Sequence, residues 1–151
     1  MAYPIVQVSD GVTKEIIQAG HGIVPQKGST ITVHCTGSLA NPLRKFWSTK
    51  DPGQQPFTFQ VGLGKVIKVL FSIHKFMKYL ILHFVPLRSQ NKTHCGMFFI
   101  GWDEACLTMQ LGEVAKILIR SDKGYGSQGF PAWGIHPNAD LLFEIEILSI
   151  Q

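Results

Sequence analysis

The sequence predicts an α+β fold, in which an antiparallel β-sheet has one face in water and the other face covered by one short helix. Two observations carry this prediction. Several segments alternate apolar and polar residues, as half-buried strands do, whereas one segment repeats its apolar residues at helical spacing. No regular alternation of strands and helices is present, which disfavours a doubly wound nucleotide-binding fold.

Alternating segments mark the predicted strands at 31–36, 57–61, 115–120 and 141–148, and a shorter mixed run lies at 13–17. Turn signals at 41–42 and 51–53 stand on either side of 46–50. In the last strand, Phe143, Ile145 and Ile147 are expected to face the core, whereas Glu144 and Glu146 are expected to face water.

The predicted helix begins at Gly101 and stops near Gly112, a residue suited to a left-handed C-terminal turn. Its apolar face consists of Trp102, Ala105, Cys106 and Met109. Asp103 and Glu104 would then lie in the first turn, where the helix dipole favours anions. Trp102 is expected to lie between the helix and the sheet.

The 151 residues are expected to form one domain, with 69–100 set apart as an inserted segment of foreign composition. Four of the 14 basic residues lie in this segment, which has no Asp or Glu, and the other ten balance the ten acidic residues. The basic pI near 9.1 therefore belongs to one segment. A general nucleic-acid-binding surface is not expected.

The apolar run at 69–87 is long enough to be considered as a membrane span. Its apolar side chains would contribute about 5 kcal/mol to insertion, whereas Lys75 and Lys78 near its middle would cost about 5 to 7 kcal/mol. A span is therefore not expected, and an amphipathic helix on a membrane surface is the weaker alternative.

The cysteines Cys35, Cys95 and Cys106 lack the paired spacing of a zinc site or a disulfide framework. The first residues lack the basic and long apolar regions of a secretory signal. We therefore expect a cytoplasmic protein in a reducing compartment, with no metal and no cofactor.

The segment 124–129 matches the G-x-G-x-x-G spacing of dinucleotide-binding loops. Such a loop must open a helix, whereas Pro131 and Gly134 follow here, so a long loop is the better interpretation. His34 and Cys35 are neighbours on a predicted strand and point to opposite faces, which excludes a thiolate dyad. Composition alone leaves an aromatic and aliphatic set that is either core or an apolar binding site.

Six sequence blocks stand out: VHCTG at 33–37, FWSTKDPG at 46–53, GKVIK at 64–68, GWDE at 101–104, GFPAWGI at 129–135 and FEIE at 143–146. Together they resemble the FK506-binding proteins, the FKBP family of peptidyl-prolyl cis-trans isomerases, and above all its small single-domain plant members. The blocks keep the family's order over nearly the whole chain outside 69–100. The resemblance implies a curved antiparallel sheet wrapped around one short helix.

The resemblance also implies an isomerase and immunophilin that binds proline-containing peptides and the macrolides FK506 and rapamycin, the latter with ternary protein partners. The implied protein is a monomer. The residues matching the family's catalytic positions are Phe46, Trp102, Tyr125 and Phe143, with Trp102 as the pocket floor. The residues matching its substrate- and ligand-binding positions are Cys35, Trp47, Phe57, Val66, Ile67, Phe130, Trp133 and Ile135.

Four features depart from the family pattern. Trp47 stands where many members have Asp, Cys35 stands where Tyr is common, and Lys123-Gly124 replaces an aromatic-Ala pair. The segment 69–100 separates two blocks that the family joins almost directly. A second interpretation is therefore a weak or inactive binding module whose segment blocks the pocket or docks a partner or membrane; the segment is also consistent with altered transcript processing.

Overall fold

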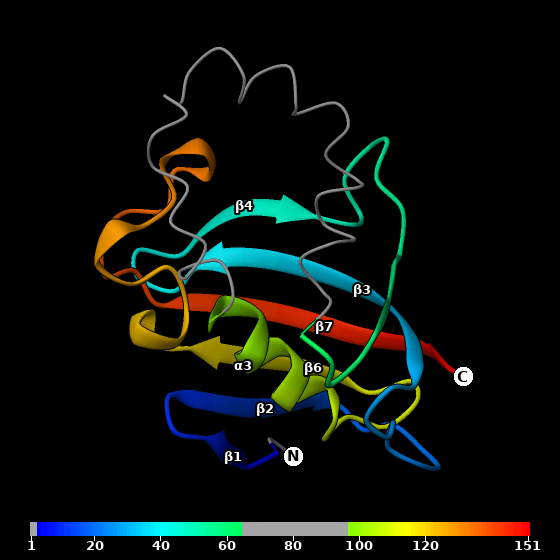
Figure 1. Ribbon diagram of the computed structural model, residues 1–151. Coiled ribbons are helices and arrows are strands. Elements are labelled where there is room, and N and C mark those ends of the chain that lie inside the picture. The colour runs from blue at the N-terminus through cyan, green and yellow to red at the C-terminus, as the bar shows by residue number, and fades with distance from the viewer. Residues whose placement is uncertain (1–2, 65–96) are drawn as a thin grey trace.

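The computed structural model describes residues 3–64 and 97–151 (Figure 1). Within them lie strands β1 (Ile5–Ser9), β2 (Val12–Gln18), β3 (Thr30–Leu39), β4 (Arg44–Ser48), β5 (Phe57–Gln60), β6 (Val114–Ile119) and β7 (Leu141–Ile150), and helix α3 (Met97–Cys106). Short 3-10 turns follow at η1 (Ser121–Lys123), η2 (Gly126–Gln128) and η3 (Pro131–Trp133). The α+β prediction is confirmed, because α3 lies across one face of an antiparallel sheet (Figure 1).

The sheet has the strand order β1-β2-β6-β7-β3-β4, with β5 paired to β3 off this path, and every pair is antiparallel. Strand β3 pairs with β7 along one side, and with β5 and then β4 along the other. The four predicted strands are confirmed, and the mixed run at 13–17 lies in β2. Strand β1 was not predicted, because as an edge strand it exposes its apolar residues Ile5 and Val6.

The core forms where alternate residues of the long strands face α3. Phe143, Ile145 and Ile147 are buried as predicted, whereas Glu144 is exposed and Glu146 half-buried. Strands β3 and β6 supply Ile31, Val33, Cys35, Ala115, Ile117 and Ile119, all buried. Each fully buried large aliphatic side chain contributes about 1.5 to 3 kcal/mol relative to exposure.

Helix α3 begins at Met97 and ends at Cys106, so the predicted bounds are wrong at both ends. Asp103 and Glu104 therefore lie inside the helix, and their predicted role at its first turn is wrong as well. Asp103 instead accepts a hydrogen bond from the backbone N–H of Gly64 at 2.8 Å, and Glu104 accepts one from the Ser9 hydroxyl. The predicted apolar face is confirmed, because Trp102, Ala105, Cys106 and Met109 are all buried.

Helix α3 ends before the predicted stop at Gly112 because the residues around Gly112 form hydrogen bonds with strand β7. The Gly112 N–H donates to the Ile147 carbonyl at 2.9 Å, and the Ile147 N–H donates to the Glu113 carbonyl at 3.1 Å. Gly112 has the predicted left-handed backbone, with φ of 76°, but it serves the turn into β6 and not the helix end.

A buried ion pair fixes this turn to the sheet. The Lys14 ammonium lies 2.9 Å from Glu113 Oε1 and also donates to the Thr108 carbonyl at 2.8 Å. Glu113 Oε2 accepts the Gln110 N–H at 2.9 Å. Lys14 and Glu113 are 6% and 3% exposed, so each charge depends on the other for its solvation.

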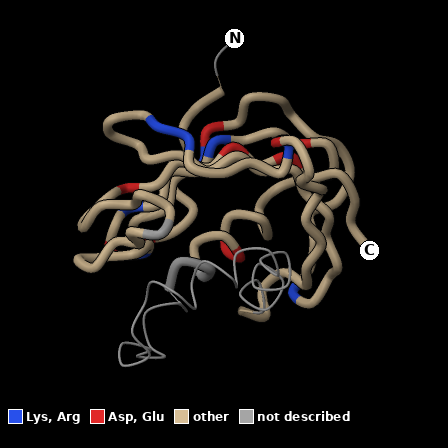
Figure 2. Tube along the Cα trace, turned by 90° about the horizontal axis from the view of Figure 1, so that it is seen from above, with Lys and Arg blue, Asp and Glu red and all other residues tan. Residues whose placement is uncertain are grey.

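Both signs of charge are interspersed along the described trace (Figure 2). Within residues 3–64 and 97–151, no helix is long and apolar enough to cross a membrane. The run at 69–87 that was considered as a span lies outside the described residues.

We predict that Glu113→Gln lowers the free energy of unfolding by about 3 to 5 kcal/mol, because it leaves the buried Lys14 charge unpaired. Urea unfolding measures the loss. The matched control is Lys45→Met, which breaks the exposed Lys45–Asp51 pair and should cost less than about 1 kcal/mol. Equal losses in the two variants would contradict the anchoring role of Lys14–Glu113.

Candidate functional site

Eight aromatic side chains form one continuous series of ring contacts, here called the aromatic cluster. Its members are Phe46, Phe57, Phe59, Trp102, Tyr125, Phe130, Trp133 and Phe143. Trp102 lies at its inner end, with ring centroids 6.0 Å from Phe57, 6.0 Å from Phe59 and 5.5 Å from Phe143. These four inner rings are at most 3% exposed.

The outer rings continue the series toward the surface. Phe46 lies edge-on to Phe143 at 6.0 Å and stacks on Trp133 at 5.8 Å. Trp133 meets Phe130 at 5.4 Å, and Phe130 stacks on Tyr125 at 5.2 Å. All four outer rings are half-buried, so the cluster leads from solvent to the core.

A β-bulge in β4 delivers Phe46 to the cluster. Ser38 pairs with Lys45 and Gly37 pairs with Trp47, so Phe46 has no residue opposite it on β3. A β-bulge changes the direction in which a side chain points, and bulges are common beside functional sites.

Gly37 makes the space in which two of these rings meet. A Cβ at this position would lie 2.7 Å from Phe46 Cε2 and 2.8 Å from Phe143 Cε1, both too close for van der Waals contact. Any larger residue at 37 would force the two rings apart. The requirement is steric, because Gly37 is not among the glycines with positive φ.

The outer part of the cluster sits on the turns that precede β7. Segment 124–129 forms the short 3-10 turn η2 and its flanks, so the predicted loop is confirmed and no α-helix opens there. The Phe130 N–H donates to the Ile135 carbonyl at 2.8 Å and the Ile135 N–H donates back at 3.1 Å, which closes a small loop around η3. Ile135 is buried beneath this loop, whereas Trp133 is half-buried on it.

The indole N–H of Trp102 is a buried donor to which the described residues offer no hydrogen-bond acceptor. Leaving such a donor unpaired costs about 1 to 3 kcal/mol. An unsatisfied polar group inside an otherwise apolar cluster calls for an explanation, and a ligand acceptor is one chemical possibility.

The structure brings together seven of the aromatic residues predicted from the sequence. Cys35 and Ile135 are buried in the adjoining core, and Trp47 packs against it half-buried. Val66 and Ile67 lie outside the described residues. The sequence analysis missed Phe59, although strand alternation places it on the same buried face as Phe57, and it missed the steric role of Gly37.

The buried thiols are unsuited to nucleophilic chemistry. The pKa of the Cys35 thiol lies well above its ordinary value, mainly because the thiol is buried and to a lesser extent because of the nearby Cys106. The pKa of the Cys106 thiol is raised as well, mainly by its burial and to a lesser extent by the charge of Asp103. His34 and Cys35 face opposite sides of β3, where burial alternates along the strand: Cys35 is buried, whereas His34 is half-buried and its Nδ1 lies 2.8 Å from the Thr49 hydroxyl. The described part of the chain holds no group of three His, Cys, Asp or Glu suited to a metal.

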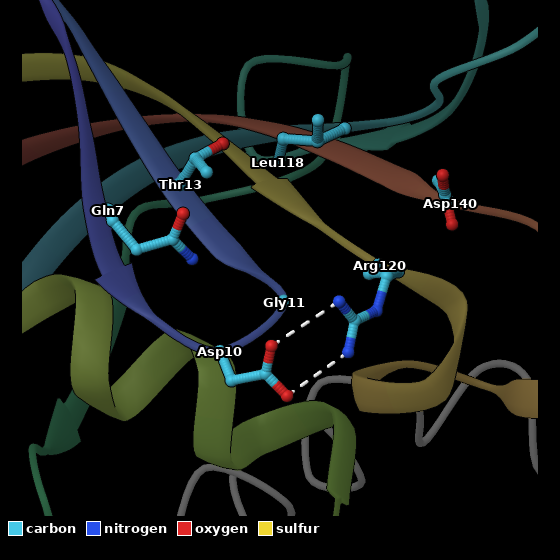
Figure 3. A pocket seen from close by; sticks show the side chains of 7 residues that line it. All are labelled: Gln7, Asp10, Gly11, Thr13, Leu118, Arg120 and Asp140. Atoms are coloured by element: carbon cyan, nitrogen blue, oxygen red, sulfur yellow. Dashed lines mark hydrogen bonds and ion pairs between the residues drawn. The ribbon is translucent and has the colours of Figure 1, made fainter.

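A cavity of about 450 Å³ lies away from the aromatic cluster, on the outer face of β1, β2 and β6 (Figure 3). Its lining consists of Gln7, Asp10, Gly11, Thr13, Leu118, Arg120 and Asp140. The Arg120 guanidinium lies 3.2 Å from Asp10 and also binds Asp122, which raises its pKa and lowers that of Asp122. Arg120, Asp10 and Asp122 thus neutralise one another, and Asp140 accepts the Ser121 N–H at 2.7 Å, so each charged group that lines this cavity already has a partner.

Gly37→Ala is predicted to separate Phe46 from Phe143, with a stability loss of about 1 to 3 kcal/mol from overpacking. The loss should be accompanied by altered near-UV circular dichroism of the aromatic rings. Gly101→Ala is the matched control, because its added methyl would meet its nearest atom at 3.2 Å and lies in a helix that favours Ala. Unchanged aromatic signals in Gly37→Ala would argue against the steric role of Gly37.

Stability is predicted to fall above about pH 8.5, the ordinary thiol pKa, because the unfolded chain then releases protons that the buried thiols retain. Each thiol contributes a slope of up to about 1.4 kcal/mol per pH unit. Urea unfolding between pH 7.5 and 10 measures this slope. The comparison uses two proteins that both carry Cys95→Ser, one with Cys106 and one with Cys106→Val. The slope should be smaller in the Cys106→Val protein. An unchanged slope would mean that Cys106 does not retain its proton.

Comparisons with known proteins identify the family of this chain. Residues 22–148 match the family model described as FKBP-type peptidyl-prolyl cis-trans isomerase. The chain is 47% identical to peptidyl-prolyl cis-trans isomerase FKBP12 of Vicia faba and 45% identical to that of Arabidopsis thaliana; each alignment covers 93% of this chain and 99% of the relative. The N-terminal domain of FKBP42 from Arabidopsis thaliana shares the fold, with a TM-score of 0.72 at 23% identity, over 100% of this chain and 94% of that chain. The chain belongs to the FKBP-type peptidyl-prolyl cis-trans isomerase family.

Proposed function

We propose that this protein catalyses cis–trans isomerisation of the peptide bond before proline, and that it binds macrolides of the FK506 and rapamycin type at the same place. The observation that carries the proposal is the aromatic cluster, in which apolar rings lead from solvent to the buried Trp102. The similarity to plant FKBP12 proteins over nearly the whole chain supports it.

The reaction explains why a site without a nucleophile or an acid–base pair suffices. Rotation about the peptide bond faces a barrier of about 18 to 20 kcal/mol because it interrupts amide resonance. The twisted amide is less dipolar than the planar one, so an apolar surround disfavours the ground state more than the transition state. Each 1.4 kcal/mol of that difference accelerates rotation about tenfold.

In this proposal Trp102 is the floor against which the proline ring packs, and Phe46, Phe57 and Phe143 are its walls. Their edge-on and stacked contacts hold the rings in fixed positions. The Trp102 N–H, which has no acceptor among residues 3–64 and 97–151, supports a ligand that carries a carbonyl acceptor, as peptides and these macrolides do. Tyr125 and Trp133 would contact the parts of the ligand nearer to solvent.

A second candidate is an FKBP-like binding module with little or no isomerase activity. Trp47 supports it, because many family members have an acidic residue there, whereas this half-buried indole adds bulk beside Phe46. Such a protein would still bind ligands although it catalyses little or no isomerisation.

The proposal extends to the setting of the protein. We place it in the cytoplasm as a monomer that forms ternary complexes when a macrolide is bound. The free thiols of Cys35 and Cys106 support a reducing compartment.

Trp102→Phe is predicted to lower kcat/KM for a prolyl peptide at least tenfold and to weaken FK506 binding at least tenfold, because it removes both ring area and the N–H. The measurements are a peptide cis/trans assay and calorimetry on the full chain. Ile147→Val is the control, since this core residue outside the aromatic cluster should cost about 0.5 to 1.5 kcal/mol of stability without loss of activity per folded molecule. FK506 binding without catalysis in the parent chain would favour the second candidate, and neither activity would refute both.

A further inference from the structure

The loop that carries Trp133 is closed on itself, and it meets the rest of the site through Ile135, which is buried in the core, and through Phe130, which stacks on Tyr125 at 5.2 Å. Its ends are joined by the reciprocal Phe130–Ile135 hydrogen bonds, and the Gly134 N–H donates to the Pro131 carbonyl at 2.9 Å. The Gly134 carbonyl accepts a hydrogen bond from a residue of β4. Strand β4 therefore contributes to the position of Trp133, in addition to the contact of this ring with Phe130.

Strand β4 contacts the loop through two of its residues, which are two positions apart in the sequence. Arg44 Nη2 donates to the Gly134 carbonyl, and Phe46 stacks on Trp133 with ring planes 21° apart. The guanidinium is in close contact as well as hydrogen-bonded, because a Cβ on Gly134 would lie 2.8 Å from Arg44 Nη2 and 3.2 Å from Nη1. Gly134, with φ of 66°, is suited to this approach both by its backbone and by its lack of a side chain.

The charge of Arg44 serves no ion pair within the described residues. Its neighbour Lys45 has the same charge and is exposed as well, but it binds Asp51 at 2.6 Å instead of the loop. Of these two adjacent cations, one therefore closes the β4 turn and the other holds the Trp133 loop. A hydrogen bond from a charged donor to a carbonyl is stronger than a neutral one.

We infer that Arg44 is a positioning residue: by holding the Gly134 carbonyl, it fixes Trp133 against Phe46 and sets the affinity of the site for the part of a prolyl peptide beside Trp133. The inference rests on the proposed function. Arg44 acts at the half-buried outer end of the aromatic cluster, whereas Trp102 and Phe143 lie buried at its inner end. Its loss therefore weakens substrate binding and leaves the chemical step largely intact.

The test compares Arg44→Met, Arg44→Lys and the control Lys45→Met in the full chain. Arg44→Met is expected to raise KM for a prolyl peptide three- to tenfold with kcat within twofold, while Arg44→Lys, which keeps a donor, recovers most of the loss. Lys45→Met should leave KM and kcat unchanged. Melting temperatures within about 2 °C of the parent separate positioning from general destabilisation.

A double-mutant cycle with Gly134→Ala identifies the contact. Because the added methyl displaces the same guanidinium, the double variant should be no worse than the more severe single variant. Equal KM values for Arg44→Met and Lys45→Met, or additive effects in the cycle, would overturn the inference.

An independent readout keeps this result separate from the fate of the proposed function. The indole N–H signal of Trp133 and the amide signal of Gly134 in ¹⁵N NMR should shift and show faster local motion in Arg44→Met, whether or not the parent is an active isomerase. Unchanged signals would overturn the positioning role even if the parent is active. Shifted signals in a parent without activity would uphold the role of Arg44 in the loop and refute only the catalytic proposal.

Discussion

The packing of Trp102 between helix and sheet is the constraint on which the rest of the structure depends. Helix α3 has ten residues, too few to be stable alone in water, so its stability must come from the face that it buries. Trp102 supplies much of that face, and it contacts rings from β5 and β7. The same side chain thus joins the two layers of the fold and forms the inner end of the aromatic cluster, so folding and site formation are one event.

Local backbone features then bring the outer rings to Trp102. The bulge at Phe46 turns a ring inward from β4, and the missing side chain at Gly37 lets that ring meet Phe143. The turns before β7 add Tyr125, Phe130 and Trp133. A site of this kind needs shape more than reactive groups, which is why glycines and bulges matter here as much as the aromatic residues.

The sheet could be predicted from the sequence because a period of two survives wherever one face is buried, as in β3 and β7. The helix bounds could not be predicted in this way. Pairing of Gly112 and Glu113 with Ile147 decides where α3 ends, and such a long-range contact leaves no pattern in the local sequence. Family motifs led to most of the aromatic cluster. They did not reveal Phe59, Gly37 or Arg44, whose importance comes from contacts between strands and loops distant in sequence.

The hydrogen bond from Gly64 to Asp103 has a consequence for how this fold tolerates change. It fastens the end of the β5 turn to the helix across 39 positions of sequence, directly beside Trp102. Lengthening a closed loop from about 3 to about 35 residues costs only about 2 kcal/mol of entropy. The connection between β5 and α3 can therefore change in length at little cost in stability, because the Gly64 amide and the Asp103 carboxylate hold its described ends together.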